Sequence, residues 1–239
     1  MASDPQKDLE KSIDVELEDY FVDSSICQCG QKAAFGCEGF CRTCFHKSKF
    51  EAISIESRLI SVGVPSRTAG KVAKLARDGE FDRNPIKRSI IEKSFNDSVF
   101  LSGVPGCGKT ALSIAIMIDH MRKYNTEKEY LQPGVEFLFE TTTGMIQKLQ
   151  KAFKLPYAEE EAIINRYKNI DFLILDDIGV EKPSEWVFMM IYLIINHRYE
   201  EFRQTIFTSN FSVAQIAEKY GDERLTRRIT HGCSIIGLG

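Results

Sequence analysis

The chain has 239 residues, of which 43% are hydrophobic and 27% are charged, and its formal net charge is −3. This composition excludes a disordered or fibrous protein, and the length predicts one full domain with a smaller module, since domains contain roughly 150 residues. The longest apolar run, residues 187–195, has nine residues, whereas a membrane-spanning helix needs about 20. The chain opens on acidic and polar residues rather than on a signal segment. We therefore expect a cytoplasmic protein.

Charge is distributed unevenly along the chain. Residues 1–24 carry eight acids and two lysines, a balance of −6, whereas residues 42–93 carry twelve basic and six acidic residues, a balance of +6. Such segments are either solvated surface or arms that bind protein or nucleic acid, and the sequence leaves both possibilities open.

Five of the seven cysteines lie between residues 27 and 44. In a reducing compartment, an odd cluster of this kind favours zinc over a disulfide framework. Zinc takes four thiolates at tetrahedral corners, and two short cysteine pairs can supply them from a segment too small to bury a core. The expected zinc ligands are Cys27, Cys29, Cys41 and Cys44, with Cys37 and His46 as further candidates. Reduced thiols without metal are the alternative.

A helix is predicted over residues 50–62, and it ends at Gly63-Val64-Pro65, because glycine and proline stop a helix. We place a boundary there, with an N-terminal module at 1–62 and the main domain at 63–239. From residue 98 onward, short apolar stretches alternate with longer amphipathic ones, which predicts an α/β fold with a parallel sheet covered on both faces. The predicted strands are 99–102, 135–140, 171–175, 205–208 and 233–237, and the predicted helices are 109–123, 143–154, 184–202, 213–219 and 222–231.

A phosphate-binding loop occupies the first strand-to-helix junction. Residues 103–110 read GVPGCGKT, a complete GxxxxGK[ST] motif. Its glycines let backbone N–H groups surround phosphate oxygens, Lys109 reaches the β- and γ-phosphates, and Thr110 offers a hydroxyl to Mg²⁺. The motif predicts binding of ATP with Mg²⁺, and the expected contacts are Gly103, Pro105, Gly106, Cys107, Gly108, Lys109, Thr110 and Ala111.

The predicted strand 171–175 ends in a pair of acids. Asp176 suits the position of a Mg²⁺ ligand, and Asp177 follows where a carboxylate can orient or activate the attacking water. The next predicted strand leads to Asn210, whose side chain could reach the γ-phosphate or that water. A strand is also predicted between the phosphate loop and the acid pair, at 135–140, which is typical of hydrolysing ATPases rather than of small-molecule kinases. Together these features predict an ATPase.

Two groups of basic residues are candidates for further contacts. Arg224 and Arg228 lie four apart on one face of a predicted helix, where they form either a solvated basic face or an arginine finger for the nucleotide of a neighbouring subunit. Lys148, Lys151 and Lys154 recur every three residues, and they form either a solvated face or a stripe that binds the phosphates of single-stranded DNA.

Three segments resemble the AAA+ ATPases that load the bacterial replicative helicase, the DnaC and DnaI proteins, and their transposition relatives of the IstB type. These segments are 175–182 (LDDIGVEK), 206–210 (IFTSN) and 221–229 (GDERLTRRI). The resemblance covers residues from about 60 to 239, and it implies a P-loop AAA+ domain whose nucleotide site is completed by self-association. It favours Arg228 as the finger, with Arg224 as its partner. It also implies that the N-terminal module binds the helicase while the ATPase domain binds single-stranded DNA.

The sequence departs from many AAA+ ATPases in two ways. The chain ends shortly after the last predicted strand, so we expect no C-terminal helical lid, and Asp177 stands where many AAA+ ATPases have glutamate, so we expect slow hydrolysis suited to a switch. Three functions stay open: an ATP-dependent loader of a replicative helicase, an IstB-type transposition helper and a non-hydrolysing adapter. The intact Lys109, Thr110 and acid pair argue against the adapter.

Overall fold

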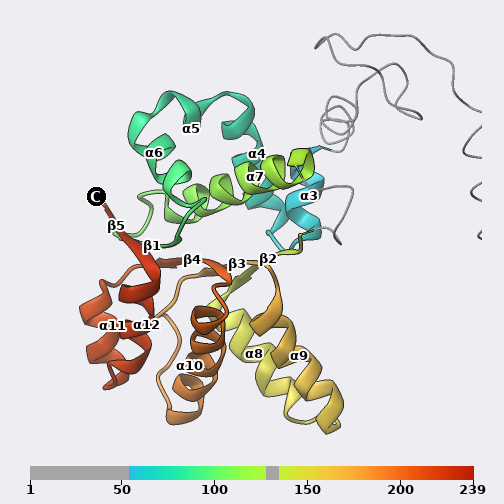
Figure 1. Cartoon of the computed structure of the whole chain (residues 1–239), viewed down its shortest axis with the longest axis vertical. Coiled ribbons are helices and arrows are strands. Elements are labelled where there is room, and N and C mark those ends of the chain that lie inside the picture. The colour runs from blue at the N-terminus through green and yellow to red at the C-terminus, as the bar shows by residue number, and fades with distance from the viewer. Residues whose placement is uncertain (1–53, 128–134) are drawn as a thin grey trace, which may run out of the picture.

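The computed structural model describes residues 54–127 and 135–239. Its centre is a five-stranded sheet in which all pairs of neighbouring strands run parallel, in the order β2-β3-β4-β1-β5 (Figure 1). The strands are β1 (Ser98–Gly103), β2 (Phe137–Thr141), β3 (Phe172–Asp176), β4 (Gln204–Ser209) and β5 (Cys233–Leu238). The α/β fold and the five strands predicted from the sequence are confirmed.

Helices cover both faces of the sheet, as Figure 1 shows. Side chains alternate between the faces along each strand: on β1, Val99 and Leu101 belong to one apolar core, whereas Phe100 belongs to the other. The first face carries α3 (Ile55–Ser61), α4 (Ser66–Arg77), α5 (Glu80–Arg83), α6 (Pro85–Lys93) and α7 (Lys109–Glu127). The second carries α8 (Thr142–Ala152), α9 (Tyr157–Asn169), α10 (Glu185–Glu200), α11 (Val213–Tyr220) and α12 (Arg224–Gly232).

Local capping residues set the limits of several helices. Asn84 caps the backbone N–H groups of the first turn of α6, and Pro85 follows at the first helical position, where its missing N–H costs nothing. Ser212 and Gln215 form a reciprocal capping box at the start of α11. That helix ends at Gly221, whose φ of 67° is left-handed.

The structure contains helices that the sequence analysis does not predict. Residues 66–93 form α4 to α6, and residues 157–169 form α9. Tyr167 is the one fully buried residue of helix α9, so this helix lacks the broad apolar stripe by which an amphipathic helix is recognised. In addition, α8 ends at Ala152 rather than at the predicted residue 154.

Helix α3 packs in the same core as the main domain. Leu59 is fully buried with residues of α4 and α7, and the carbonyl of Val62 accepts a hydrogen bond of 2.8 Å from the Phe139 N–H on the outer edge of β2. Gly63 has a φ of +102°, and a Cβ there would lie 2.5 Å from the Phe139 carbonyl oxygen. The chain at the predicted boundary is therefore held against the sheet edge, and the extent of a separate N-terminal module stays a prediction.

No helix in the described ranges combines the length and apolar character needed to span a membrane.

Candidate nucleotide site

The phosphate-binding loop connects the end of β1 to the start of α7, as predicted. Gly106 and Gly108 have φ values of 84° and 97°, and a Cβ at either position would meet nothing within 4 Å. The left-handed backbone, rather than lack of space, therefore requires these glycines. At Gly103 the reason is different, because a Cβ there would lie 2.0 Å from the carbonyl oxygen of Leu238 on β5.

Lys109 is almost completely buried at the first position of α7, with 5% of its surface exposed. Its ammonium group donates hydrogen bonds of 2.9 Å to the carbonyls of Gly103 and Val104 and to the side-chain oxygen of Asn210. An ammonium group has three protons, so each of these three acceptors can receive one of them. The half-buried Cys107 lies further off, with its Sγ 3.8 Å from the nitrogen.

Thr110 and Asp176 bring hard oxygen atoms together beside the loop. The Thr110 hydroxyl donates a hydrogen bond of 2.9 Å to Oδ1 of Asp176, whose side chain is nearly buried at the end of β3. Burial raises the pKa of Asp176, while hydrogen bonds from Thr208 and Thr110 and the nearby Lys109 charge oppose the rise. A hydroxyl and a carboxylate suit Mg²⁺, which usually takes few protein ligands and completes its shell with phosphate and water.

Asp177 and Asn210 complete the group of polar residues at this edge of the sheet. Asp177 is half-buried and has a left-handed backbone with φ 56°, which is unusual for a residue other than glycine. Asn210 follows β4, and β4 lies between β1 and β3 in the sheet. The strand predicted at 135–140 is β2, and it precedes the acid pair in sequence but lies at the sheet edge. It is therefore β4 that places Asn210 between the loop and the acids.

The family of this chain is shown by its similarity to known proteins. A family described as IstB-like ATP binding protein matches residues 88–239, which include the loop, the acid pair, Asn210 and both arginines. The chain belongs to this family. Its members bind ATP, and the P-loop AAA+ fold expected from the sequence is confirmed.

Several known proteins are similar to this IstB-like protein. The replicative helicase loader DnaC of Escherichia coli K12 is 28% identical over 138 residues, which are 58% of this chain and 52% of DnaC. An insertion sequence IS21 putative ATP-binding protein of Pseudomonas aeruginosa is 30% identical over 141 residues, which are 59% of this chain and 48% of the relative. This chain thus spans about half the length of the curated relatives that it matches.

Solved structures support the fold. A crystal structure of the DnaC helicase loader has a TM-score of 0.51 and 23% identity, and the match covers 72% of this chain and 90% of that one. A replication initiator DnaA bound to AMPPCP and single-stranded DNA has a TM-score of 0.53 and 20% identity, covering 65% of this chain and 46% of DnaA.

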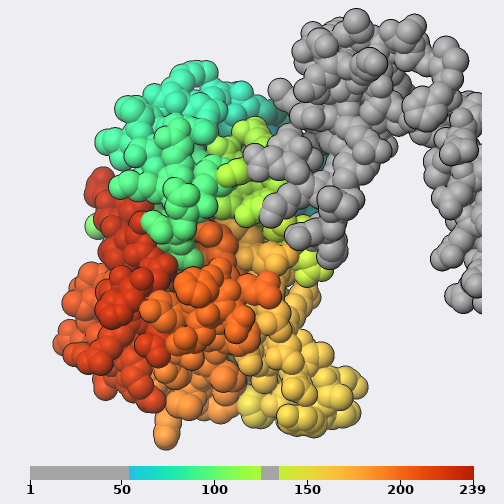
Figure 2. Space-filling view, in the orientation of Figure 1, coloured from blue at the N-terminus to red at the C-terminus, as the bar shows by residue number. Residues whose placement is uncertain are grey.

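The two arginines of this IstB-like protein lie on α12, which packs against α10. Arg224 donates hydrogen bonds to Asp222 and stacks over the rings of Phe188 and Tyr192. Arg228 donates a hydrogen bond of 2.7 Å to the side-chain oxygen of Asn196 and lies over another tyrosine ring. Helices α11 and α12 lie at one side of the molecule, where no other described segment covers them in the view of Figure 2. The finger role stays a prediction.

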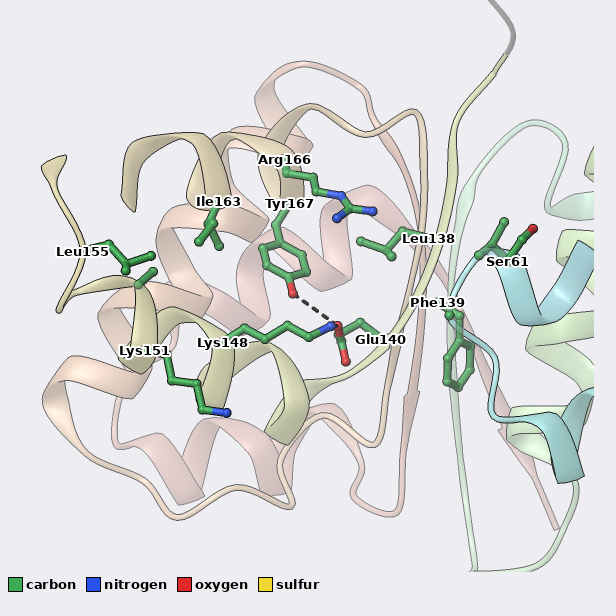
Figure 3. Close-up of a pocket in the computed structure, with 13 residues that line it drawn as sticks. Ser61, Leu138, Phe139, Glu140, Lys148, Lys151, Leu155, Ile163, Arg166 and Tyr167 are labelled. Atoms are coloured by element: carbon green, nitrogen blue, oxygen red, sulfur yellow. Dashed lines mark hydrogen bonds and ion pairs between the residues drawn. The ribbon is translucent and has the colours of Figure 1, made fainter. Parts of the chain in front are cut away.

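The three lysines predicted to contact DNA do not share one helix. Lys148 and Lys151 lie on α8, whereas Lys154 follows the end of that helix. Lys148 forms an ion pair with Glu140, which also accepts a hydrogen bond from the Tyr167 hydroxyl. Lys148 and Lys151 line a cavity of about 450 Å³ between α8, α9 and β2 (Figure 3). In this view Lys151 points away from the ion pair.

The predicted zinc ligands lie outside the described residues. This applies to Cys27, Cys29, Cys41 and Cys44 and to the further candidates Cys37 and His46. Within residues 54–127 and 135–239, no three His, Cys, Asp or Glu side chains are grouped so that they could hold a metal ion. Zinc therefore stays a prediction from the cysteine spacing.

Thr208 is not among the site residues predicted from the sequence. It is fully buried on β4, and its hydroxyl contacts both members of the acid pair. The sequence places it in the segment 206–210 that also holds Asn210, but nothing there indicates a contact with the acids.

Proposed function

We propose that this protein is an ATPase that loads a replicative DNA helicase onto single-stranded DNA. The observation that carries the ATPase part is the meeting of Lys109, Asn210 and the acid pair at one edge of the sheet, through hydrogen bonds of 2.9 Å from Lys109 to Asn210 and from Thr110 to Asp176. These side chains come from the ends of two strands, β3 and β4, and from the start of α7.

The reaction is the hydrolysis of ATP to ADP and phosphate. The loop amides and Lys109 hold the phosphates, and Thr110 and Asp176 are the residues that would hold Mg²⁺, which neutralises phosphate charge when bound. The Asp177 carboxylate orients a water molecule whose oxygen attacks the γ-phosphorus, and the bond from that phosphorus to the β-phosphate oxygen breaks. Asn210 contacts the γ-phosphate or the water. Because aspartate is shorter than glutamate, we expect slow turnover.

In this proposal, the arginine pair on α12 completes the nucleotide site between subunits. Arg228, with Arg224 as its partner, reaches the nucleotide of a neighbouring copy, so hydrolysis depends on self-association. Each arginine has to leave its present partners, Asn196 and Asp222 respectively, to do so. The Arg224–Asp222 pair is exposed and so contributes little stability. The half-buried Arg228 would also have to leave Glu200, which lies 3.7 Å away.

The loader part rests on the similarity to DnaC, which covers about half of that protein's length. The N-terminal module, residues 1–62, binds the helicase and is stabilised by zinc. The lysines of α8 and Lys154 bind single-stranded DNA, an arrangement favoured by the exposed positions of Lys151 and Lys154.

A transposition helper is the second candidate, because an IS21 ATP-binding protein is as similar in sequence as DnaC is. Such a helper would act on a transposase with the same ATPase core. A non-hydrolysing adapter is disfavoured, because it would not need the intact acid pair.

Two measurements test the proposal with the full chain. ATP hydrolysis by the protein and by Lys109→Ala tests the ATPase, and equal rates would contradict it. Retention of the host's replicative helicase by the immobilised full chain tests the loader, whereas retention of an IS21-type transposase instead would favour the transposition helper. Zinc is tested by metal analysis of the protein and of Cys41→Ser, since structural zinc sites bind with about 10–16 kcal/mol of apparent free energy in finger peptides.

A further inference from the structure

The Thr208 hydroxyl joins the two acids of the site. It donates a hydrogen bond of 2.6 Å to Oδ1 of Asp176 and accepts one of 2.9 Å from the backbone N–H of Asp177. A hydroxyl has one proton and two lone pairs, so it can donate to Asp176 and accept from Asp177 at the same time. With no exposed surface, Thr208 has no water to replace these contacts.

This hydroxyl acts beyond the last residue pair between β3 and β4, whereas the pairing of β3 with β2 still includes Asp176. The pairing of β3 with β4 ends at Leu175 and Phe207, one residue before the acid pair. Beyond that point, the carbonyl of Thr208 accepts a hydrogen bond of 2.8 Å from the Ile178 N–H, and the Ser209 hydroxyl donates one of 2.6 Å to the Ile178 carbonyl. The turn that carries both acids is therefore attached to β4 mainly through Thr208 and its neighbour.

Asp177 has a backbone conformation that depends on surrounding contacts such as this attachment to β4. Its φ of 56° lies in the left-handed region, which non-glycine residues occupy only when surrounding contacts hold them there. Among the described residues, no hydrogen bond fixes the Asp177 carboxylate, so the backbone position is what limits where this side chain can reach. The Thr208 hydroxyl holds that backbone at its N–H group.

We propose that Thr208 is a positioning residue for ATP hydrolysis, which holds Asp176 beside Thr110 and holds Asp177 in the backbone conformation that directs its carboxylate toward the attacking water. This inference rests on the proposed ATPase activity. It extends that proposal to a residue that does not touch the substrate. It also explains how β4, which Asn210 follows, is connected to the acid pair.

The test compares Thr208→Val, which keeps the shape of the side chain but removes the hydroxyl, with Thr208→Ser, which keeps the hydroxyl. A misplacement of about 1 Å can cost on the order of 10²-fold in rate. We expect kcat of Thr208→Val to fall about 10- to 100-fold while KM changes less than about threefold. Thr208→Ser should keep at least about half of the wild-type kcat.

Thr205→Val is the matched control, because Thr205 is a buried threonine of the same strand whose hydroxyl accepts a hydrogen bond from Arg198, outside the site. We expect this variant to lower the melting temperature without lowering kcat. If Thr208→Val does not fold, Thr208→Ala removes the same hydroxyl without adding an apolar group. Equal loss of kcat in Thr208→Ser, or an unchanged kcat in Thr208→Val, would overturn the inference.

Nucleotide binding separates this inference from the proposed ATPase. The Mg²⁺ concentration that half-saturates binding of a fluorescent ATP analogue should rise in Thr208→Val and stay at the wild-type value in Thr208→Ser and Thr205→Val. If the wild-type protein hydrolyses no ATP, the ATPase proposal fails, and this binding measurement still decides whether Thr208 positions Asp176. An unchanged Mg²⁺ requirement in Thr208→Val would then contradict that role.

Discussion

The ammonium group of Lys109 donates a hydrogen bond of 2.9 Å to the side-chain oxygen of Asn210, although the two residues are 101 positions apart in the chain. The same ammonium group also donates to two carbonyls of the phosphate loop. Since it has only three protons, binding a phosphate must displace at least one of these acceptors. The hydrogen bond between Lys109 and Asn210 therefore depends on whether the loop holds a phosphate.

Asn210→Ala should separate nucleotide binding from hydrolysis. The loop that holds the phosphates stays intact, so we expect the dissociation constant of an ATP analogue to change little. Loss of a polar group near the reacting phosphate should lower kcat on the order of 10²-fold. Asn169→Ala removes an exposed asparagine at the end of α9 and should keep wild-type kcat. An Asn210→Ala protein with full activity would exclude a sensing role.

Mixing two inactive variants tests whether the nucleotide site is shared between subunits. Arg228→Ala should lower hydrolysis by about 10³-fold or more if the arginine is a finger, and Lys109→Ala should abolish it. Mixed assemblies contain some sites with an intact lysine and an intact neighbouring arginine, so activity should partly recover.

Arg227→Ala is the matched control for the finger. Arg227 lies on the same helix and pairs with Glu223 at an exposed position, with 66% of its side chain accessible, so its loss should leave hydrolysis unchanged. No recovery on mixing would count against a shared site. A similar loss in Arg227→Ala would indicate a general effect of charge on α12.

Lys151→Ala should weaken the binding of single-stranded DNA. Lys151 is exposed on α8, whereas Lys148 is already paired with Glu140. If Lys151 binds a phosphate, its removal should reduce the slope of log affinity against log salt by about 1. Lys71→Ala removes an exposed lysine of α4 and should not change the slope. Fluorescence anisotropy with labelled oligonucleotides measures both quantities, and equal slopes for the wild type and Lys151→Ala would contradict DNA contact there.

His120 should make folding stability depend on pH. Burial, together with the nearby Lys123 charge, lowers the pKa of His120 to about 4, while an unfolded histidine has a pKa of about 6.5. Between these values the unfolded state takes up a proton that the folded state does not. Stability is therefore lost as the pH falls through 6.5 toward 4.

The measurement compares the wild type with His120→Phe. The His120 ring stacks on Phe95 at a centroid distance of 4.3 Å and is tilted against Phe172 at 4.7 Å, and a phenyl ring can keep both contacts. From pH 7.5 to 5 the wild type should lose about 2 kcal/mol more stability than the variant. Parallel losses in both proteins, measured by urea unfolding, would show that His120 is not the group responsible.

Much of the site can be predicted from the sequence, because its motifs are contiguous segments. The phosphate loop from Gly103 to Thr110 is contiguous, and its glycines and lysine carry their chemistry in any fold that places them between a strand and a helix. The acid pair is likewise marked by the apolar strand before it. These segments were sufficient to predict an ATP-binding α/β domain, which the family comparison confirms.

The tertiary structure decided the relationships between distant segments. Which strand lies between β1 and β3 depends on pairing across the whole domain, and it is β4 that brings Asn210 to Lys109 and Thr208 to the acids. Helix α9 and the hydrogen bond from Phe139 to the Val62 carbonyl also depend on non-local packing. A threonine in a strand carries no local signal of its partner, because that partner is chosen only when the sheet forms. Residue types thus determined the chemistry available to this protein, and strand order determined which residues perform it together.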